Sequence, residues 1–365
     1  MKKVGLYIHV PFCVKKCGYC DFYSVAGNEQ LMDEYTAAVT DALGAYRGKI
    51  SADTVYFGGG TPSVLGGKRI SAVLNAAREM ISDGAEITVE LNPGDSLNDF
   101  YEQCSAAGVN RVSIGLQSAD DNELRLLTRR HTASDVKDAV RLARLNGISN
   151  ISLDLMLGIE GQTKKSIANS VDFCADLGVN HISAYMLKIE EGTPFARAKG
   201  GSRFPDEDAV ADMYLFAVGR LADRGYEQYE ISNFAANGAK SRHNLKYWNC
   251  EEYVGIGPSA HSFYGGKRFF YPRSITDFIS GKKPVSDGSG GDFDEYAMLR
   301  LRLSDGLIFT EAKKRFSDAE RRYEKLLEKA QRYEQAGLCA ADGDKIALNS
   351  RGFLVSNMII GDLLG

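Results

Sequence analysis

The sequence places three cysteines within eight residues, at Cys13, Cys17 and Cys20. Thiolates spaced so closely can converge on one metal centre. A structural zinc ion needs four protein ligands, and the one nearby histidine, His9, lies inside a predicted strand. An iron–sulfur cluster held by three cysteines leaves one iron open to a ligand from outside the protein. We therefore favour a cluster over zinc, and over cysteines that merely fill a core.

Residues that could hold a small polar ligand follow the later predicted strands. The run GGGTP, Gly58 to Pro62, offers backbone that a ligand can approach without meeting a Cβ atom. A carboxylate at a strand end suits ribose hydroxyls, and an arginine binds a carboxylate through paired hydrogen bonds. The residues of this kind are Glu90, Gln117, Arg129 and Asp154. Each alone is an ordinary surface group, whereas four on the same rim predict a shared site.

These residues are positioned by a regular alternation of short β-rich runs and longer helical patterns over the first 230 residues. The predicted strands are Val4–Val10, Thr54–Phe57, Glu86–Glu90, Arg111–Ile114, Asn150–Leu155 and His181–Leu187. The predicted helices are Glu29–Arg47, Lys68–Ser82, Ser134–Asn146 and Thr163–Asp176, with Gly147 and Gly178 as caps after the last two. Six β-then-α units predict an α/β fold, a partial (β/α)6 TIM-like barrel whose carboxyl-end loops carry the site.

After Gly225 the alternation stops. Glu227–Ile231 is interpreted as one more short strand, and the residues up to 284 show no clear period. The turn-rich run Gly281–Asp292 is typical of a linker or exposed loop. Beyond it we predict helices at Glu295–Leu303, Thr310–Phe316, Arg321–Ala336 and Arg351–Leu364, and a hairpin at Leu338–Leu348. The chain thus divides into a barrel at 1–230, a bridge at 231–284 and a smaller, mainly helical C-terminal domain at 285–365.

Length and composition fit a globular protein of two or three domains. The 365 residues are 44% hydrophobic and 25% charged, and 44 Lys and Arg against 48 Asp and Glu give a net charge of −4. Such a charge does not favour nucleic acid as a partner. We find no apolar run near the roughly 18 residues of a membrane span and no signal peptide, so we expect a cytoplasmic protein. Seven cysteines, an odd number, favour reduced thiols or a metal site.

The C-x3-C-x2-C spacing, with Tyr19 just before the last cysteine, resembles the signature of the radical SAM superfamily. In that superfamily S-adenosylmethionine chelates the open iron of a [4Fe–4S] cluster, and an electron from the cluster cleaves it to a 5′-deoxyadenosyl radical. The resemblance implies that Cys13, Cys17 and Cys20 hold such a cluster. The protein would then keep cluster and sulfonium in contact and exclude water and oxidants.

Longer segments resemble one branch of this superfamily, which holds the oxygen-independent coproporphyrinogen III oxidases and the related heme chaperones. The matching segments are IHVPFCVKKCGYCDF, YFGGGTPS, ELNPGD, RVSIGLQS and LDLMLG. The resemblance is specific through residue 260 and weaker in the last part of the chain. It implies contacts to S-adenosylmethionine from Tyr7, Tyr19, Gly59, Gly60, Thr61, Glu90, Gln117, Arg129 and Asp154.

Two features separate the oxidases from the chaperones. The oxidases have a long N-terminal extension that helps to shape the porphyrinogen site, and a further cysteine two positions after the last cluster cysteine. Here only twelve residues precede Cys13, and Phe22 occupies the later position. Both departures argue against decarboxylation of coproporphyrinogen, and they leave open whether this chain is an enzyme.

The stretch SRHNLKYWNC, Ser241 to Cys250, matches the HNxxYW element associated with heme binding in the chaperone group. Neutral imidazole is a good axial ligand for heme iron, and Tyr247 and Trp248 offer flat apolar surface to a macrocycle. The motif therefore implies His243 as the heme ligand. The structural alternative is a hydrogen-bonded His243 in an aromatic cluster that supports the barrel.

Other histidines and cysteines carry less functional weight. His261 could supply a second heme ligand, whereas His131 and His181 are interpreted as structural or surface residues. Cys104 and Cys174 fall within helical patterns and are most simply buried apolar side chains.

The sequence as a whole favours a cytoplasmic heme chaperone that holds a [4Fe–4S] cluster, S-adenosylmethionine and heme. Heme would pass to an acceptor apoprotein such as a respiratory heme enzyme, and any membrane association would be peripheral, through that acceptor. The alternative is an oxygen-independent coproporphyrinogen III oxidase, which decarboxylates two propionates with radicals from S-adenosylmethionine. A zinc-stabilised binding module is the third hypothesis.

Overall fold

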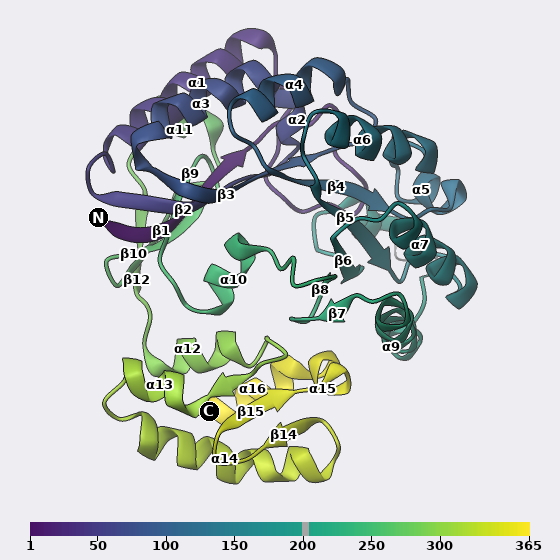
Figure 1. The fold of residues 1–365 in the computed structure, drawn as a ribbon, viewed down its shortest axis with the longest axis vertical. Helices are drawn as coiled ribbons and strands as arrows, with labels where there is room; N and C mark the ends of the chain where they lie inside the picture. The colour runs from purple at the N-terminus through teal and green to yellow at the C-terminus, as the bar shows by residue number, and fades with distance from the viewer. Residues whose placement is uncertain (199–203) are drawn as a thin grey trace.

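The computed structural model describes residues 1–198 and 204–365, and a twelve-stranded sheet dominates it (Figure 1). Six parallel strands pair in sequence order at its centre: β1 (Lys2–Val10), β2 (Ile50–Gly59), β3 (Ile81–Leu91), β4 (Arg111–Gln117), β5 (Asn150–Leu157) and β6 (His181–Met186). The outer helices are α1 (Glu29–Gly44), α3 (Gly67–Ala77), α4 (Asn98–Ala106), α6 (Ala133–Leu145), α7 (Lys164–Asp176) and α9 (Glu207–Asp223). The predicted α/β fold with a partial barrel is confirmed.

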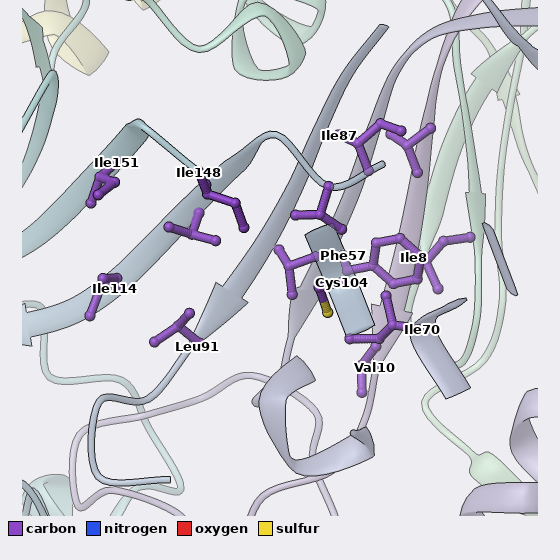
Figure 2. Close-up of a cluster of buried hydrophobic side chains, with 14 of the residues drawn as sticks. Ile8, Val10, Phe57, Ile70, Ile87, Leu91, Cys104, Ile114, Ile148 and Ile151 are labelled. Atoms are coloured by element: carbon purple, nitrogen blue, oxygen red, sulfur yellow. The ribbon is translucent and has the colours of Figure 1, made fainter. Parts of the chain in front are cut away.

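The core between sheet and helices follows from the period of two along each strand. In β1 every second residue from Val4 to Val10 is fully buried. Figure 2 shows Ile8 of this strand in a layer with Phe57 of β2 and Ile70 of α3. Cys104 lies in the same layer and is buried, as its helical pattern predicted. The other face of β1 is thereby left to line the lumen of the barrel.

Local signals in the sequence set the helix ends. Thr132 accepts a hydrogen bond from the Asp135 backbone, and the Asp135 side chain accepts one in return, which closes a capping box at the start of α6. Gly147 and Gly178 follow α6 and α7 with φ angles of 79° and 62°, a conformation that glycine adopts at little cost. The predicted caps at these two glycines are confirmed.

Several boundaries differ from the prediction, most of all the one between the second helix and the third strand. The helix expected over Lys68–Ser82 ends at Ala77, a 3-10 helix covers Arg78–Met80, and β3 begins at Ile81 instead of Glu86. The start of β3 is polar and partly exposed, so its residues show no buried face that would have marked a strand. The remaining short helices of the barrel are α2 (Pro62–Leu65), α5 (Asp121–Leu126) and α8 (Pro194–Ala198).

Residues beyond the six units extend the sheet at both edges. At one edge β9 (Tyr253–Ile256) pairs in parallel with β1, and β10 (His261–Tyr264), β11 (Lys267–Phe270) and β12 (Val285–Ser289) follow. At the other edge β8 (Asn233–Ala235) and β7 (Glu227–Gln228) follow β6. The predicted bridge therefore supplies sheet strands as well as α10 (Arg242–Trp248) and α11 (Ile275–Ile279). The run expected as a linker contains β12, an exposed edge strand whose residues need no apolar pattern.

The C-terminal residues build a second core beside the open side of the barrel (Figure 1). Its helices are α12 (Phe293–Arg300), α13 (Phe309–Arg315), α14 (Ala319–Gln335), α15 (Ser350–Leu354) and α16 (Ser356–Leu364). The predicted hairpin is confirmed as β14 (Cys339–Ala341) and β15 (Lys345–Leu348), and β13 (Leu307–Ile308) joins it as an unpredicted third strand. Among the helices of the described ranges, none combines the length and the apolar character that a bilayer crossing requires.

Candidate functional site

The three cysteines lie in the loop between β1 and α1, and that loop is fixed by its own backbone. Cys13 N–H donates to Val25 O at 3.1 Å, and Cys20 N–H donates to Cys17 O at 3.2 Å. Gly18 N–H donates to Thr128 Oγ1 at 2.9 Å, which ties the middle of the loop to the far side of the barrel. The three thiols are half-buried and free. The loop therefore presents its cysteines at the carboxyl ends of the strands, as predicted.

A cavity of about 660 Å³ opens beside this loop. Most of the residues predicted to form the site line it: Cys13, Cys17, Tyr19, Cys20, Gly59, Gly60, Thr61, Glu90, Gln117, Arg129 and Asp154. They come from the first loop and from the ends of β2, β3, β4 and β5, together with the segment after α5. Residues far apart in the sequence thus meet at one hollow.

The surroundings of the thiols fit a cluster with an open iron. Thr61 Oγ1 lies 3.3 Å from Cys13 Sγ, and Arg129 Nη1 donates to Cys17 Sγ at 3.6 Å. Burial raises the pKa of the Cys20 thiol, so its thiolate form needs a nearby positive charge such as iron. Across the described ranges, no three His, Cys, Asp or Glu side chains are grouped as ligands of a single ion. In a [4Fe–4S] cluster each thiolate binds its own iron, so three cysteines need not meet at one point.

The glycines after β2 allow the close approach of two loops. A Cβ at Gly60 would lie 2.7 Å from Phe12 O, and one at Gly59 would lie 2.6 Å from the His9 ring. Gly60 N–H donates to Val10 O and Thr61 N–H to Phe12 O, both at 2.8 Å. The glycine run is therefore needed to dock this loop against the cysteine loop, besides opening backbone to the cavity.

Two carboxyl groups on the cavity wall have raised pKa values. Glu90 Oε1 accepts a hydrogen bond from Tyr56 Oη at 2.7 Å, and Asp154 Oδ1 accepts one from Ser113 Oγ at 3.1 Å. Burial raises the pKa of Glu90 to about 7 and also raises the pKa of Asp154. Perturbed carboxyl groups in a cleft are typical of functional sites. Ordered acceptors at these positions suit the hydroxyl groups of a ribose.

Arg129 is held where a carboxylate ligand can reach it. Its Nη2 donates to Gly115 O at 2.9 Å, and its buried Nε has no hydrogen-bond partner within the described residues. A Cβ at Gly115 would lie 2.9 Å from Arg129 Nη2 and 2.8 Å from Gln117 Nε2, so glycine makes room for both side chains. Gln117 itself has a φ of 70°, a strained conformation for this residue type and one that clusters at ligand sites.

Tyr7 does not line the cavity. Its hydroxyl lies 3.1 Å from His9 Nδ1, and its ring packs near Tyr56 and His243 at centroid distances of 6.3 and 6.4 Å. Burial raises the pKa of this phenol far above its usual value. The structure therefore places Tyr7 beneath the cavity, in the packing that supports it.

His243 lies deeper still, in α10 within the lumen (Figure 1), and its side chain is fully buried. Its Nδ1 lies 2.8 Å from Thr54 Oγ1 and its Nε2 lies 2.8 Å from Tyr247 Oη. The ring stacks on Tyr56 at 5.1 Å, and burial lowers its pKa to about 3. In this arrangement neither nitrogen is available to heme iron, and the structural alternative for His243 describes what is observed.

Sequence reasoning missed several wall residues. They include Asn92, Ser113, Gly115, Met156, Tyr185 and Lys188. Ser113, Gly115 and Gln117 are every second residue of β4, so the alternation of side chains along a strand could have found the first two. Tyr185 lies near the end of β6, and no sequence motif indicates that this residue faces the cavity.

The geometry agrees with the comparisons to known proteins. A model of the radical SAM superfamily matches residues 7–174, and a model of the HemN C-terminal domain matches residues 294–355. The fold and the cysteine-lined cavity thus define a radical SAM protein.

Relatives that span most of the chain narrow this class. The heme chaperone HemW of Mycobacterium tuberculosis H37Rv is 35% identical over 379 residues, covering 99% of this chain and 95% of the relative. HemW of Bacillus subtilis 168 is 34% identical and covers 98% of both chains. HemW of Escherichia coli K12 is 39% identical over 317 residues and covers 82% of both chains. The chain belongs to the heme chaperone HemW family.

A solved structure supports the fold assignment. The coproporphyrinogen III oxidase HemN from Escherichia coli, described as a radical SAM enzyme, superposes with a TM-score of 0.84 over 100% of this chain and 90% of that chain. The two sequences are 20% identical, so the likeness shows a shared fold.

Proposed function

We propose that this protein binds heme and delivers it to an acceptor apoprotein, as a heme chaperone whose barrel holds a [4Fe–4S] cluster and S-adenosylmethionine. The observation that carries the proposal is the single cavity that collects Cys13, Cys17 and Cys20 with the polar residues of four strands. Similarity along the whole chain to proteins named heme chaperone supports heme as the cargo.

The cavity residues would divide the binding of cluster and cofactor among them. When bound, the cluster and S-adenosylmethionine supply a one-electron donor and a cleavable sulfonium. Arg129 would bind the methionyl carboxylate, because its guanidinium is buried and incompletely paired. The backbone near Gly59 and Gly60 would accept the amino group, and Glu90 and Asp154 would orient the ribose. The three cysteine side chains are half-buried, which would limit access of water and oxidants to the cluster.

The destination of heme is the remaining part of the proposal. We propose a cytoplasmic location, an acceptor such as a respiratory heme enzyme, and membrane association only through that acceptor. His243 could act as the axial ligand only if heme iron entered a fully buried layer and displaced one of its two hydrogen bonds of 2.8 Å.

The proposal is tested on protein reconstituted anaerobically with iron and sulfide. The wild-type chain should hold about four irons and about four labile sulfides, and S-adenosylmethionine should change the paramagnetic-resonance spectrum of the reduced cluster. Replacing Cys13, Cys17 and Cys20 together by serine should bring iron and sulfide close to zero. The matched control is Cys250→Ser, since Cys250 is also half-buried but lies outside the cavity. About one zinc without labile sulfide would contradict the cluster.

Heme delivery needs its own measurement. Heme-loaded protein is mixed with a heme-depleted respiratory enzyme, and the regained activity of that enzyme is followed. An anaerobic assay with reductant, S-adenosylmethionine and coproporphyrinogen III addresses the oxidase alternative. Formation of protoporphyrinogen would contradict a purely chaperone function, whereas restored acceptor activity without porphyrinogen turnover is the expected result.

A further inference from the structure

The histidines differ sharply in what their ring nitrogens contact. The chain has five histidines, all within the described residues. In four of them, His9, His131, His181 and His243, both nitrogens are hydrogen-bonded at 2.7–3.2 Å and the side chain is no more than 4% exposed. A nitrogen that is engaged in this way offers no lone pair to iron. Ligation of heme by any of these four would require a rearrangement of the core.

His261 is the exception. Its side chain is exposed, and within the described residues neither of its ring nitrogens makes a hydrogen bond. It is the first residue of β10, which runs antiparallel to β9, and β9 runs parallel to β1. The start of β10 therefore lies at the carboxyl end of β1, where the cysteine loop begins.

The register places His261 on the inner face of the sheet. Phe263 pairs with Tyr253, which in turn pairs with Gly5 of β1. A Cβ at Gly5 would lie 3.2 Å from the His243 ring inside the lumen, so this face of the sheet points inward. Because His261 is two residues from Phe263 on a regular strand, it shares that face. An exposed imidazole thus stands on the inner surface, beside the mouth of the barrel.

A neighbouring aromatic ring fixes the plane of this imidazole. Phe270 of β11 pairs directly with His261, and the two rings stack with centroids 5.2 Å apart and planes 24° apart. An axial imidazole stands edge-on to the heme, so a ring stacked on its face restricts rotation without blocking the nitrogens. Phe270 therefore acts as a positioning residue for the imidazole.

The segment after β11 supplies a positive charge and a physical link to the cysteine loop. Arg273 Nη2 donates to Asp21 O at 2.7 Å, and Ile275 N–H donates to Tyr23 Oη at 2.9 Å. Arg273 Nη2 also lies 3.7 Å from Asp21 Oδ1, and because the Arg273 side chain is 54% exposed, its guanidinium can still be reached by a heme propionate. The residues that follow the strand of Phe270 thus hold the cysteine loop through these hydrogen bonds.

We infer that His261 is the axial ligand of the cargo heme, oriented by Phe270, and that Arg273, three residues after Phe270, offers a guanidinium to a propionate. This inference deepens the proposed function and rests on it, since it names the residue that would hold the cargo. The heme would then sit on the β10–β11 extension at the mouth of the barrel, next to the cysteine loop.

The test is a titration of the full-length protein with hemin, followed through the Soret band and the paramagnetic-resonance signal of ferric heme. His261→Ala should weaken hemin binding about tenfold or more and abolish the spectrum of an imidazole-ligated heme. In His261→Gly, added imidazole should restore that spectrum, because it can occupy the vacated position. Phe270→Leu should cause a smaller loss, since the ligand remains and only its orientation is freed.

Folding and competing ligands are controlled in the same experiment. Because His261 is exposed, its variants should have the same melting temperature as the wild-type protein, as measured by circular dichroism. A folded His243→Gln variant should keep the wild-type Soret band. Unchanged hemin affinity and spectrum in His261→Ala, or their loss in folded His243→Gln alone, would overturn the inference and leave the proposed function intact. Failure of the wild-type chain to bind hemin would overturn both.

Discussion

The two ends of the barrel lumen are built in different ways. At the carboxyl ends of the strands, half-buried thiols line a cavity and Arg129 Nε has no hydrogen-bond partner among the described residues. Nearer the amino ends, His243 fills the lumen, and Thr54 and Tyr247 occupy both of its nitrogens. Buried polar groups are normally paired, and Arg129 is a residue that combines an unpaired buried nitrogen with a place on the cavity wall, which favours a ligand there. The difference supports the proposal that the cavity is the binding site, whereas His243 belongs to the packing that supports the barrel.

The largest effect on stability should come from removing His243. His243→Ala leaves two buried hydroxyl groups unpaired and opens a cavity, so the free energy of unfolding should fall by about 3 kcal/mol. Urea unfolding measures this, with His261→Ala as the exposed control, for which we expect a change within about 0.5 kcal/mol. If the free energy of unfolding fell equally little in both variants, the layer around His243 would not stabilise the barrel, and the contrast between the two ends of the lumen would be wrong.

A smaller effect should follow from crowding the cavity. Gly115→Ala adds a Cβ that lies 2.9 Å from Arg129 Nη2, so the guanidinium must leave its present position between Gly115 and Cys17. S-adenosylmethionine should then bind about tenfold more weakly to the reconstituted protein, with little change in unfolding. Equilibrium dialysis measures the affinity. Gly219→Ala in α9 is the control, because a Cβ there meets no atom within 4 Å. Equal affinities in both variants would remove Arg129 from the binding site.

Two opposite dependences on pH concern the same two regions. Burial raises the pKa of Glu90 to about 7, above its value in the unfolded chain, so this residue's contribution to stability is present below about pH 4.5 and is lost as the pH rises through 7. Burial lowers the pKa of His243 to about 3, so its contribution is present above about pH 6.5 and is lost as the pH falls toward 3.

Unfolding free energies between pH 4 and pH 8 separate these two dependences. Glu90→Gln should remove the decline between pH 4.5 and 7, and His243→Gln should remove the decline below pH 6.5. The exposed Glu102, as Glu102→Gln, is the control and should leave the profile unchanged. A profile of Glu90→Gln that parallels the wild-type profile would show that the cavity carboxyl group is not perturbed.

Much of the site could be predicted because its residues follow strands. A β/α repeat brings the carboxyl ends of parallel strands together, so Cys13, Gly60, Glu90 and Asp154 had to share one rim. Depth within the lumen was harder to predict. The resemblance implied ligand contacts for Tyr7 and His243, yet their position below the cavity depends on how α10 enters the barrel.

The edge strands also escaped prediction, for a related physical reason. Strands β9 to β12 are four or five residues long and mix glycine, aromatic and charged residues. A strand at an exposed edge needs no continuous apolar face, and its partner is chosen by tertiary contacts. Whether His261 faced the lumen or the solvent therefore required the register of the whole sheet.

The pairing of β1 has a consequence for synthesis of the chain. This first strand lies between β2 and β9, and Gly5 pairs with Tyr253, far downstream. At translation rates of about 5–20 residues per second, the second neighbour of β1 emerges on the order of ten seconds or more after the first strand. During that interval one side of β1 presents open backbone that invites pairing with other chains. The barrel edge at β1 is therefore closed only when β9 has been synthesised and has paired with it.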